Sequence, residues 1–431
     1  MNVLLIAHAY PPDPVVGAFR ARNVASAFRD AGHHVHVLAA RLPGEADRTR
    51  LKEPGLWVDT VKSYSNPLQT LSRLKTRLQR RSRGQSGAPE NLSTEPGHAV
   101  AWKRHVTSVL RVPDQYQGFV VPATIRALRI PRSRVDLLYT TAPPFSDHLV
   151  GLLLKGMTGV RWAAELRDPW TDNPLKGRSP RSTEADAMDR WLERKTLTKA
   201  DHVIVTSEST CALLRAKLPP SAADKFITVL NGIEYLCPTA AVTPRGRPFR
   251  ILHAGNIYQD RDPRPFFRGL ASIKKRLKLG PSDIEVQFVG QCRYYQGISL
   301  EAFTAKLGVA DIVHFQDWVP QEECRRLVLN ADLLLLLAQN HRYQALNKVY
   351  DYLGARKPIL AFAEADGESA RMLTRIGGHY IVSQYDRETV EGRLERVLRE
   401  PPPKPAPDSE ALLELWSTQR QMAHLVSALE T

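Results

Sequence analysis

The segment that could do chemistry most directly is N-K-V-Y-D-Y-L-G-A-R-K-P, residues 347–358. It follows the apolar run Leu333–Leu337, which is typical of a strand buried on both faces of a parallel sheet. Ligands of open α/β sheets bind beyond the carboxyl ends of the strands, where the helix predicted here would begin. Lys348 and Asp351 share one face of that helix. We therefore interpret Lys348 as a ligand for an anion such as phosphate and Asp351 as an acceptor for nearby hydroxyls, with a plain surface ion pair as the alternative.

A second candidate site follows the first predicted strand, residues 2–7. The loop after it is rich in proline and ends at Gly17. One glycine is a weak signal for a phosphate cradle compared with G-x-G-x-x-G, so a plain turn is the alternative. Arg20 falls in the first turn of the next predicted helix, residues 18–31, where a cation opposes the helix dipole. An anion in front of Arg20, on the acceptor side, would explain its presence.

A third candidate site is the run E-L-R-D-P-W-T-D-N, residues 165–173, at the end of the predicted strand 161–166. Charged residues and a tryptophan gather there on a loop, and such loops carry function more often than packing. Asp168 could serve as a general base, as an acceptor for a sugar hydroxyl or as a helix cap.

The run Asp260-Arg-Asp262 has the D-x-D appearance of a metal-chelating sugar-nucleotide site. Two carboxylates could hold Mg²⁺. Arg261 lies between them, and a guanidinium is a strong phosphate ligand. We favour the phosphate interpretation and expect no metal.

The elements that must position these residues form two α/β series. Strands are predicted at 2–7, 35–39, 135–140, 161–166, 202–206 and 226–230, and the pattern restarts at 249–254 after a proline-rich linker, 235–248. A chain of 431 residues is too long for one ordinary core. We predict an N-terminal Rossmann-like domain over residues 1–235 and a C-terminal one over 248–400. A proline-rich spacer then leads to a final helix, 409–431, which would cross back onto the first domain.

Composition restricts the partners. The net charge of +15 favours polyanions, and the four widely spaced cysteines fit a reducing cytoplasm. Neither a signal peptide nor a membrane-spanning stretch is evident, so membrane contact would be peripheral. Residues 66–89 carry six basic and no acidic side chains, with leucines at helical spacing. This segment predicts binding to a membrane surface or an acidic groove, with a solvated helix and loop as the alternative. It has no aromatic residue to stack on bases, which disfavours nucleic acid.

Four motifs together resemble glycosyltransferase family 4, whose fold is GT-B. They are M-N-V-L-L-I-A-H-A-Y-P-P-D-P, L-V-G-L-L-L-K-G-M-T-G-V-R-W-A-A-E-L-R-D-P-W-T-D-N, G-N-I-Y-Q-D-R-D-P and N-K-V-Y-D-Y-L-G-A-R-K-P-I-L. The resemblance covers nearly the whole chain. It implies two Rossmann-like domains facing across a cleft, with a nucleotide-sugar donor held mainly by the second domain and an acceptor met by the first. Transfer would retain the anomeric configuration without a bound metal or other cofactor.

The resemblance also implies residue roles. Gly17 would approach the donor phosphates, and Arg261 matches the second basic residue of the family's diphosphate pair. The first basic residue is replaced by Asn256, and Lys348 would supply the missing charge. Asp351 matches the second acid of the family's E-x7-E motif, which holds the ribose, whereas the first acid's position is Tyr343 or another residue of the loop His341–Ala345. Gly367 and Glu368 match a loop at the nucleotide, and Gly255 and Tyr258 are further donor-side candidates. Asp168 and Trp170 lie where the family's acceptor-side cleft residue sits, and Arg20 joins them as an acceptor-side candidate from its place in the helix.

These observations predict a retaining, metal-independent glycosyltransferase that uses a nucleotide-diphosphate sugar. Its basic charge favours a lipid-linked acceptor in cell-surface polysaccharide assembly, at the inner face of the plasma membrane. A soluble natural product as acceptor is the first alternative. A nucleotide-binding scaffold without catalysis is the second, because the first acid of the E-x7-E motif is missing.

Overall fold

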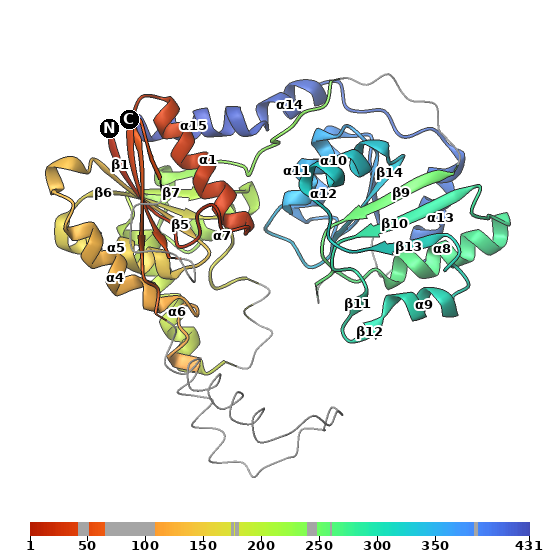
Figure 1. Cartoon of the computed structure of the whole chain (residues 1–431), viewed down its shortest axis with the longest axis horizontal. Helices are drawn as coiled ribbons and strands as arrows, with labels where there is room; N and C mark the ends of the chain where they lie inside the picture. Colours follow the sequence, from red (N-terminus) through yellow and green to blue (C-terminus); the bar gives the residue numbers. More distant parts are fainter. Residues whose placement is uncertain are drawn as a thin grey trace, which may run out of the picture. The chain divides into compact units, whose positions relative to one another are not determined.

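The computed structural model describes residues 1–41, 51–64, 108–173, 176, 181–238, 248–258, 261–382 and 387–431. The chain divides into two compact units, each built around its own sheet (Figure 1). Unit 1 contains Met1–Thr206, Thr210–Val229 and Met422–Thr431, and unit 2 contains Ser207–Ser209 and Leu230–Gln421. The basic segment 66–89 lies outside the described residues.

The sheet of unit 1 has the strand order β3-β4-β2-β1-β5-β6-β7-β8 within the described part of the chain. All neighbouring strands are parallel except β3 and β4, which are antiparallel. The strands are β1 Asn2–Ile6, β2 His34–Ala40, β3 Leu51–Glu53, β4 Leu56–Val61, β5 Leu137–Ala142, β6 Arg161–Leu166, β7 His202–Val205 and β8 Phe226–Thr228. The central strands are apolar along their length because helices cover both faces of the sheet.

Helices α4, α5, α6 and α7 pack on one face of this sheet, and α1 and α15 pack on the other (Figure 1). Their bounds are α1 Val16–Asp30, α4 Val120–Leu128, α5 Ser146–Thr158, α6 Thr183–Lys199, α7 Glu208–Arg215 and α15 Thr418–Glu430. Helix α1 begins two residues earlier than the sequence predicts. Gly17 therefore lies inside its first turn and not in the preceding loop.

The sheet of unit 2 is parallel throughout its described strands, in the order β13-β10-β9-β14-β15-β16. These strands are β9 Phe249–Ala254, β10 Ile284–Val289, β13 Val313–Gln316, β14 Leu333–Ala338, β15 Ile359–Ala363 and β16 Tyr380–Val382. A short antiparallel hairpin joins β11 Tyr294–Tyr295 to β12 Ile298–Ser299. Every residue of β14 is buried, as its run of leucines predicts.

Two groups of helices cover the two faces of this second sheet. The first group is α10 Gln321–Asn330, α11 Asn347–Gly354, α12 Glu368–Ile376 and α14 Ser409–Leu415. The second group is α8 Arg264–Leu277, α9 Leu300–Lys306 and α13 Arg387–Arg399.

The C-terminal segment differs from the single helix that the sequence predicts. It forms two helices, α14 and α15, separated at Trp416 and Ser417. Trp416 packs in the core of unit 2, whereas Met422 and Leu425 pack in the core of unit 1. The Trp416 carbonyl accepts a hydrogen bond from the Ile233 backbone at 2.8 Å. This carbonyl is bonded to another segment, which accounts for the break in the helix at this point.

In both sheets the strand order reverses between the first strand of the unit and a later neighbour. The reversal lies between β1 and β5 in unit 1 and between β9 and β14 in unit 2. The carboxyl ends of strands at such switch points are where open α/β sheets bind ligands. A ligand site is therefore expected at the loops after these strands.

Candidate functional site

A tight turn, Gly255–Asn256, follows β9 at the switch point of unit 2. Gly255 donates to the Val289 carbonyl at 2.9 Å, and the Asn256 side-chain oxygen accepts from the Gln291 backbone at 3.0 Å. A side chain at Gly290 would place its Cβ 2.7 Å from the Gly255 carbonyl oxygen, and Gly290 has a φ of +120°. The loops after β9 and β10 can approach this closely only because position 290 is glycine.

Lys348 lies against this turn from the first turn of α11. Its Cε is 3.8 Å from the point that a Cβ on Gly255 would occupy. Its ammonium group donates to the Asp351 carboxylate at 3.1 Å. The Lys348 side chain is 34% exposed and that of Asp351 is 51% exposed, so water competes for this pair. The ammonium group can therefore exchange its partner for a ligand at small cost.

Arg261 contacts the same turn. Its Nη1 donates to the Asn256 carbonyl at 3.2 Å, and its guanidinium lies 4.9 Å from the centre of the half-exposed Tyr258 ring. Arg261 and Lys348 thus border adjacent residues of one turn. The structure brings these two cations together at the switch point, with Gly255, Asn256 and Tyr258.

His253 is a further polar group at this turn, and the sequence interpretation missed it. Its Nδ1 lies 3.0 Å from the Leu335 carbonyl, which can only accept, so the ring proton is on Nδ1. Nε2 is a buried acceptor without a hydrogen-bond partner and faces Gly255, beside Lys348. Burial lowers the pKa of His253 to about 4, and the charges of Arg261 and Lys348 act in the same direction. The available signal was a histidine among the apolar residues Ile251, Leu252 and Ala254 at the end of the strand F-R-I-L-H-A.

Gly367 and Glu368 lie at the start of α12, where the predicted nucleotide loop would be. The Glu368 side chain is buried, accepts from the Ser209 hydroxyl and pairs with Arg371 at 3.2 Å. The backbone N–H groups of Gly367 and Glu368 donate to carbonyls at 2.9 and 3.1 Å. These contacts hold the loop in place, and donor contacts at Gly367 and Glu368 stay a prediction.

Asp262 also has a partner within the chain. Its carboxylate forms a bidentate pair with Arg264 at 2.8 and 2.7 Å, and its carbonyl accepts from Gln339 at 2.8 Å. Asp260 lies outside the described residues. Within the described ranges, no group of three or more histidine, cysteine or acidic side chains is arranged to hold a metal ion.

In unit 1 the predicted anion in front of Arg20 is a side chain of the chain itself. Arg20 is buried and donates to Glu165 at 2.9 Å through Nε and to the Val229 carbonyl at 3.1 Å. Thr141 donates to the same carboxylate at 2.5 Å. Burial opposes ionisation of Glu165, but the charges of Arg20 and Arg167 hold its pKa below the ordinary value. The acceptor-side role predicted for Arg20 is therefore corrected to a buried ion pair.

Gly17 makes room for Arg167. A Cβ at Gly17 would lie 2.6 and 2.8 Å from the two terminal nitrogens of the Arg167 guanidinium. Arg167 also donates to the Ala142 carbonyl at 3.2 Å. Gly17 thus packs against a cation, and the contact of its loop with the donor phosphates stays a prediction.

Trp170 and Asp168 follow β6 but have different surroundings. Trp170 is 0% exposed, its ring stacks on Phe145 at 4.7 Å, and its indole N–H donates to Asp189 at 2.7 Å. A fully buried ring offers no surface to an acceptor, so the acceptor-side prediction for Trp170 is corrected. Asp168 is half-buried and close enough to Arg167 for their charges to interact.

The switch point of unit 1 holds a second pair that the sequence interpretation missed, His8 and Asp147. The His8 backbone donates to one oxygen of the Asp147 carboxyl group at 2.8 Å, and the other oxygen is buried without a partner. Burial raises the pKa of Asp147 well above its ordinary value and lowers that of His8 to about 4. Both groups therefore favour their neutral forms.

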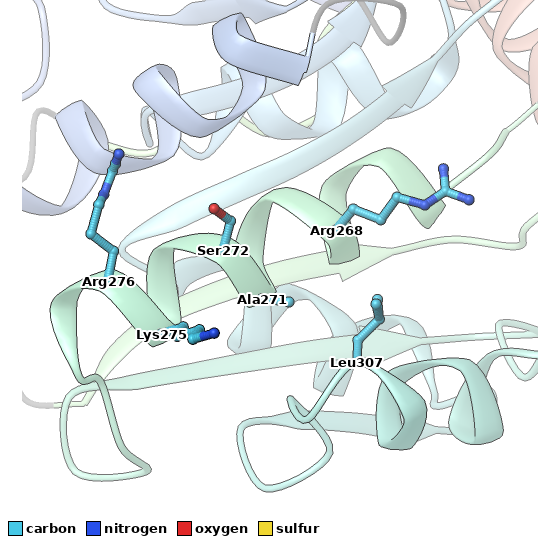
Figure 2. A pocket seen from close by; sticks show the side chains of 6 residues that line it. All are labelled: Arg268, Ala271, Ser272, Lys275, Arg276 and Leu307. Atoms are coloured by element: carbon cyan, nitrogen blue, oxygen red, sulfur yellow. The ribbon is translucent and has the colours of Figure 1, made fainter.

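A groove elsewhere on unit 2 contains none of these residues. It has a volume of about 780 Å³ and is lined by one side of α8 together with Leu307 (Figure 2). Its lining is Arg268, Ala271, Ser272, Lys275, Arg276 and Leu307. It lies along a helix and not at strand ends, so it does not coincide with the turn at Gly255.

A family comparison identifies the class of protein. The model of the glycosyl transferase 4-like domain matches residues 17–232, half of the chain. The chain belongs to the glycosyl transferase 4-like family. It is therefore a glycosyltransferase, as the resemblance implied. No protein with curated annotation matches it.

Solved structures agree on the fold. The chain is similar to sucrose-phosphate synthase of Thermosynechococcus elongatus, with 16% identity over 98% of this chain and 94% of that one and a TM-score of 0.58. It is also similar to HepE of Anabaena in complex with UDP, with 11% identity, full coverage of both chains and a TM-score of 0.62. WaaG, a glycosyltransferase involved in lipopolysaccharide biosynthesis, has 14% identity over 98% and 95% and a TM-score of 0.57. The glycosyltransferase has the GT-B fold with Rossmann-like units, which confirms the predicted fold class.

Proposed function

We propose that this glycosyltransferase binds the diphosphate of a nucleotide-sugar donor at the Gly255–Asn256 turn. The observation that carries the proposal is the placement of Lys348 and Arg261 beside adjacent residues of that turn, at the switch point of unit 2. HepE, a protein of similar fold, was solved with UDP, which is a diphosphate of the kind proposed here.

The two cations would act mainly on the leaving group. When the bond between the sugar and the diphosphate breaks, negative charge grows on the departing oxygen. Fixed cations stabilise that charge more in the transition state than in the ground state, so they raise the rate and not only the affinity. His253 stays neutral, and its Nε2 can accept a hydrogen bond from the Lys348 ammonium group when that group leaves Asp351. This would orient Lys348 toward the diphosphate.

The reaction we propose retains the anomeric configuration and needs no metal. The acceptor hydroxyl forms the new bond on the sugar face that the diphosphate leaves. Asp168 would hydrogen-bond that hydroxyl and accept its proton. Asp351 would hydrogen-bond the ribose of the donor, as the family's motif implies.

For the acceptor we propose a lipid-linked sugar in the assembly of a cell-surface polysaccharide, met at the inner face of the plasma membrane. The supporting observations are the net charge of +15 and the basic segment 66–89. Among the described residues no helix is long and apolar enough to cross a bilayer, so the membrane contact proposed is with the surface. A soluble natural product remains the alternative acceptor.

Donor hydrolysis tests the enzymatic part of this proposal. Purified protein is incubated with a panel of nucleotide sugars, and free nucleoside diphosphate is measured. We expect turnover of at least one donor, retained without added metal and in the presence of a chelator. Binding of a nucleotide without turnover of any sugar would favour the non-catalytic scaffold instead.

A further inference from the structure

Three neighbouring helices of unit 1 expose large apolar side chains on their outer surfaces. Helix α5 lies beside both α4 and α6, and all three cover the same face of the sheet (Figure 1). The most exposed of these side chains are Met157 at 63%, Val121 at 62% and Trp191 at 57%. We define the α4–α6 face by its exposed apolar residues: Val121, Ile125, Leu128, Leu153, Met157, Met188 and Trp191.

The core of unit 1 does not need these side chains. Helix α4 already buries Ala123 and Ala127 beneath its outer surface, and α5 buries Val150 and Leu154. Helix α6 likewise buries Leu197. The outward residues of α4 recur at 121, 125 and 128, which is a second apolar stripe opposite the packed one. Exposed apolar side chains that recur on three adjacent helices indicate a surface that contacts an apolar partner.

Cations lie on α6 and in the segment that follows α4. They are exposed and form no ion pair within the described ranges: Arg129, Arg132, Arg134, Arg190, Arg194, Lys195 and Lys199. Lys195 also lies 5.7 Å from the centre of the Trp191 ring. Of the acidic residues of α6, Asp189 and Glu193 are buried and ion-paired, Asp186 pairs with Arg181, and Glu184 is exposed in the first turn. Asp201, after α6, is paired with Lys155. The surface is therefore both apolar and strongly basic.

We propose that the α4–α6 face docks on an anionic lipid bilayer. Methionine, leucine and tryptophan side chains can enter the boundary between headgroups and acyl chains, while the arginines and lysines contact anionic headgroups. This proposal rests on the proposed function, in which a lipid-linked acceptor brings the enzyme to a membrane. It adds which surface of the enzyme contacts that membrane.

Charge argues against the chain's own segment 66–89 as the cover of this face. That segment carries six basic and no acidic side chains, so the cations of the α4–α6 face would repel it. An anionic bilayer is complementary to the face in both charge and polarity. Each lysine or arginine near such a surface contributes about 1 kcal/mol, roughly fivefold in affinity.

The test is sedimentation of the full chain with vesicles of phosphatidylcholine, alone or mixed with phosphatidylglycerol. We expect wild-type binding to the mixed vesicles only. The double variant Arg132→Glu/Arg194→Glu should bind them at least about tenfold more weakly. The matched control is Lys275→Glu/Lys404→Glu, which makes the same charge change at exposed sites of unit 2 and should bind within about twofold of wild type.

A second variant, Met157→Ser/Trp191→Ser, tests the apolar contribution without changing charge and should also weaken binding. Donor hydrolysis should be equal in all four proteins, which shows that the variants are folded. Equal loss in the control, or loss only on deletion of residues 66–87, would overturn the α4–α6 face as the docking surface.

Failure of this inference is distinguishable from failure of the proposed function. Transfer to a lipid-linked acceptor dispersed in detergent does not need vesicle docking. If that transfer proceeds while both variants of the α4–α6 face bind vesicles as the wild type does, only the docking surface is refuted. If those variants lose vesicle binding but only soluble acceptors are glycosylated, the lipid-linked acceptor is refuted and the docking surface is supported.

Discussion

The two switch points of this glycosyltransferase share a strand order and differ in what their charges do. In unit 1 the charged groups are neutralised by burial and pairing: Glu165 is buried against Arg20, and burial favours the neutral form of Asp147. In unit 2, Lys348 is half-buried, and its partner Asp351 is exposed to water. A position at the carboxyl ends of the strands is therefore not sufficient for a ligand site. A cation must also be able to leave its partner at small cost.

The energies of the two ion pairs make this difference concrete. Removing one partner of a buried pair leaves an uncompensated charge and costs about 3–5 kcal/mol. An exposed pair three residues apart on a helix contributes only a few tenths of a kcal/mol. Arg20–Glu165 is therefore a structural contact, whereas Lys348–Asp351 can exchange for a phosphate.

The largest effect expected is on stability in unit 1. Arg20→Met should lower the free energy of unfolding by about 3–5 kcal/mol, because it leaves the Glu165 carboxylate buried without its cation. Urea unfolding followed by circular dichroism measures the loss. The matched change in unit 2, Lys348→Met, should cost less than about 0.5 kcal/mol. Equal losses in the two variants would remove the distinction between the two sites.

Acid should destabilise both units through buried histidines. Burial lowers the pKa of His148 in unit 1 to about 3 and that of His253 in unit 2 to about 4. The unfolded chain binds a proton at each below about pH 6.5, and the folded chain does not until near pH 4 or below. The contribution of these two histidines to the free energy of unfolding is therefore fully present above about pH 6.5. It falls as pH decreases, by up to about 1.4 kcal/mol per pH unit for each group.

Urea unfolding between pH 7 and pH 4 measures this dependence. In His253→Gln the slope of the unfolding free energy against pH should be smaller by the contribution of one proton, about 1.4 kcal/mol per pH unit. A slope identical to that of the wild type would show that His253 is already protonated in the folded protein, contrary to its role as a neutral acceptor.

Substitution at the proposed diphosphate site should affect catalysis more than folding. Lys348→Ala and Arg261→Ala should each lower kcat/KM at least about tenfold, equivalent to about 1.4 kcal/mol of transition-state stabilisation. Steady-state donor hydrolysis measures the rates, and Lys275→Ala on α8 is the control cation. Wild-type rates in both variants would refute the assignment of these residues to the diphosphate.

The smallest effect expected is that of Asp351→Asn on stability. It removes only an exposed ion pair and should change the free energy of unfolding by a few tenths of a kcal/mol. Its donor KM should rise, since Asp351 is proposed to hold the ribose. Loss of several kcal/mol of stability with unchanged KM would make Asp351 a structural residue.

Local patterns were sufficient to predict much of the fold and to name part of the candidate site. The apolar run of β14 and the helical period after it predicted a strand and a helix that place Lys348 at the carboxyl edge of the sheet. The repeated α/β series predicted two parallel sheets, and Arg261 could be named from the G-N-I-Y-Q-D-R-D-P motif. Each of these features depends on residues close together in the chain.

The features that could not be predicted depend on distant segments. Glu165 lies 145 residues from Arg20, so no local pattern identifies it as the buried anion. Gly17 faces Arg167, and Trp170 stacks on Phe145. For Trp170 the residue type suggested a ligand contact, whereas tertiary packing buries its side chain in the core, and the packing partner of Gly17 is a distant cation. The break between α14 and α15 likewise follows from a hydrogen bond to Ile233.

The most direct test of the central claim is a double-mutant cycle on nucleoside diphosphate binding. Isothermal titration would compare wild type, Lys348→Ala, Arg261→Ala and the double variant, using the nucleoside diphosphate that raises the melting temperature most. Two cations on one diphosphate should couple, so the loss in the double variant should differ from the sum of the single losses by at least about 0.5 kcal/mol. Strictly additive losses, or wild-type affinity in either single variant, would contradict the account.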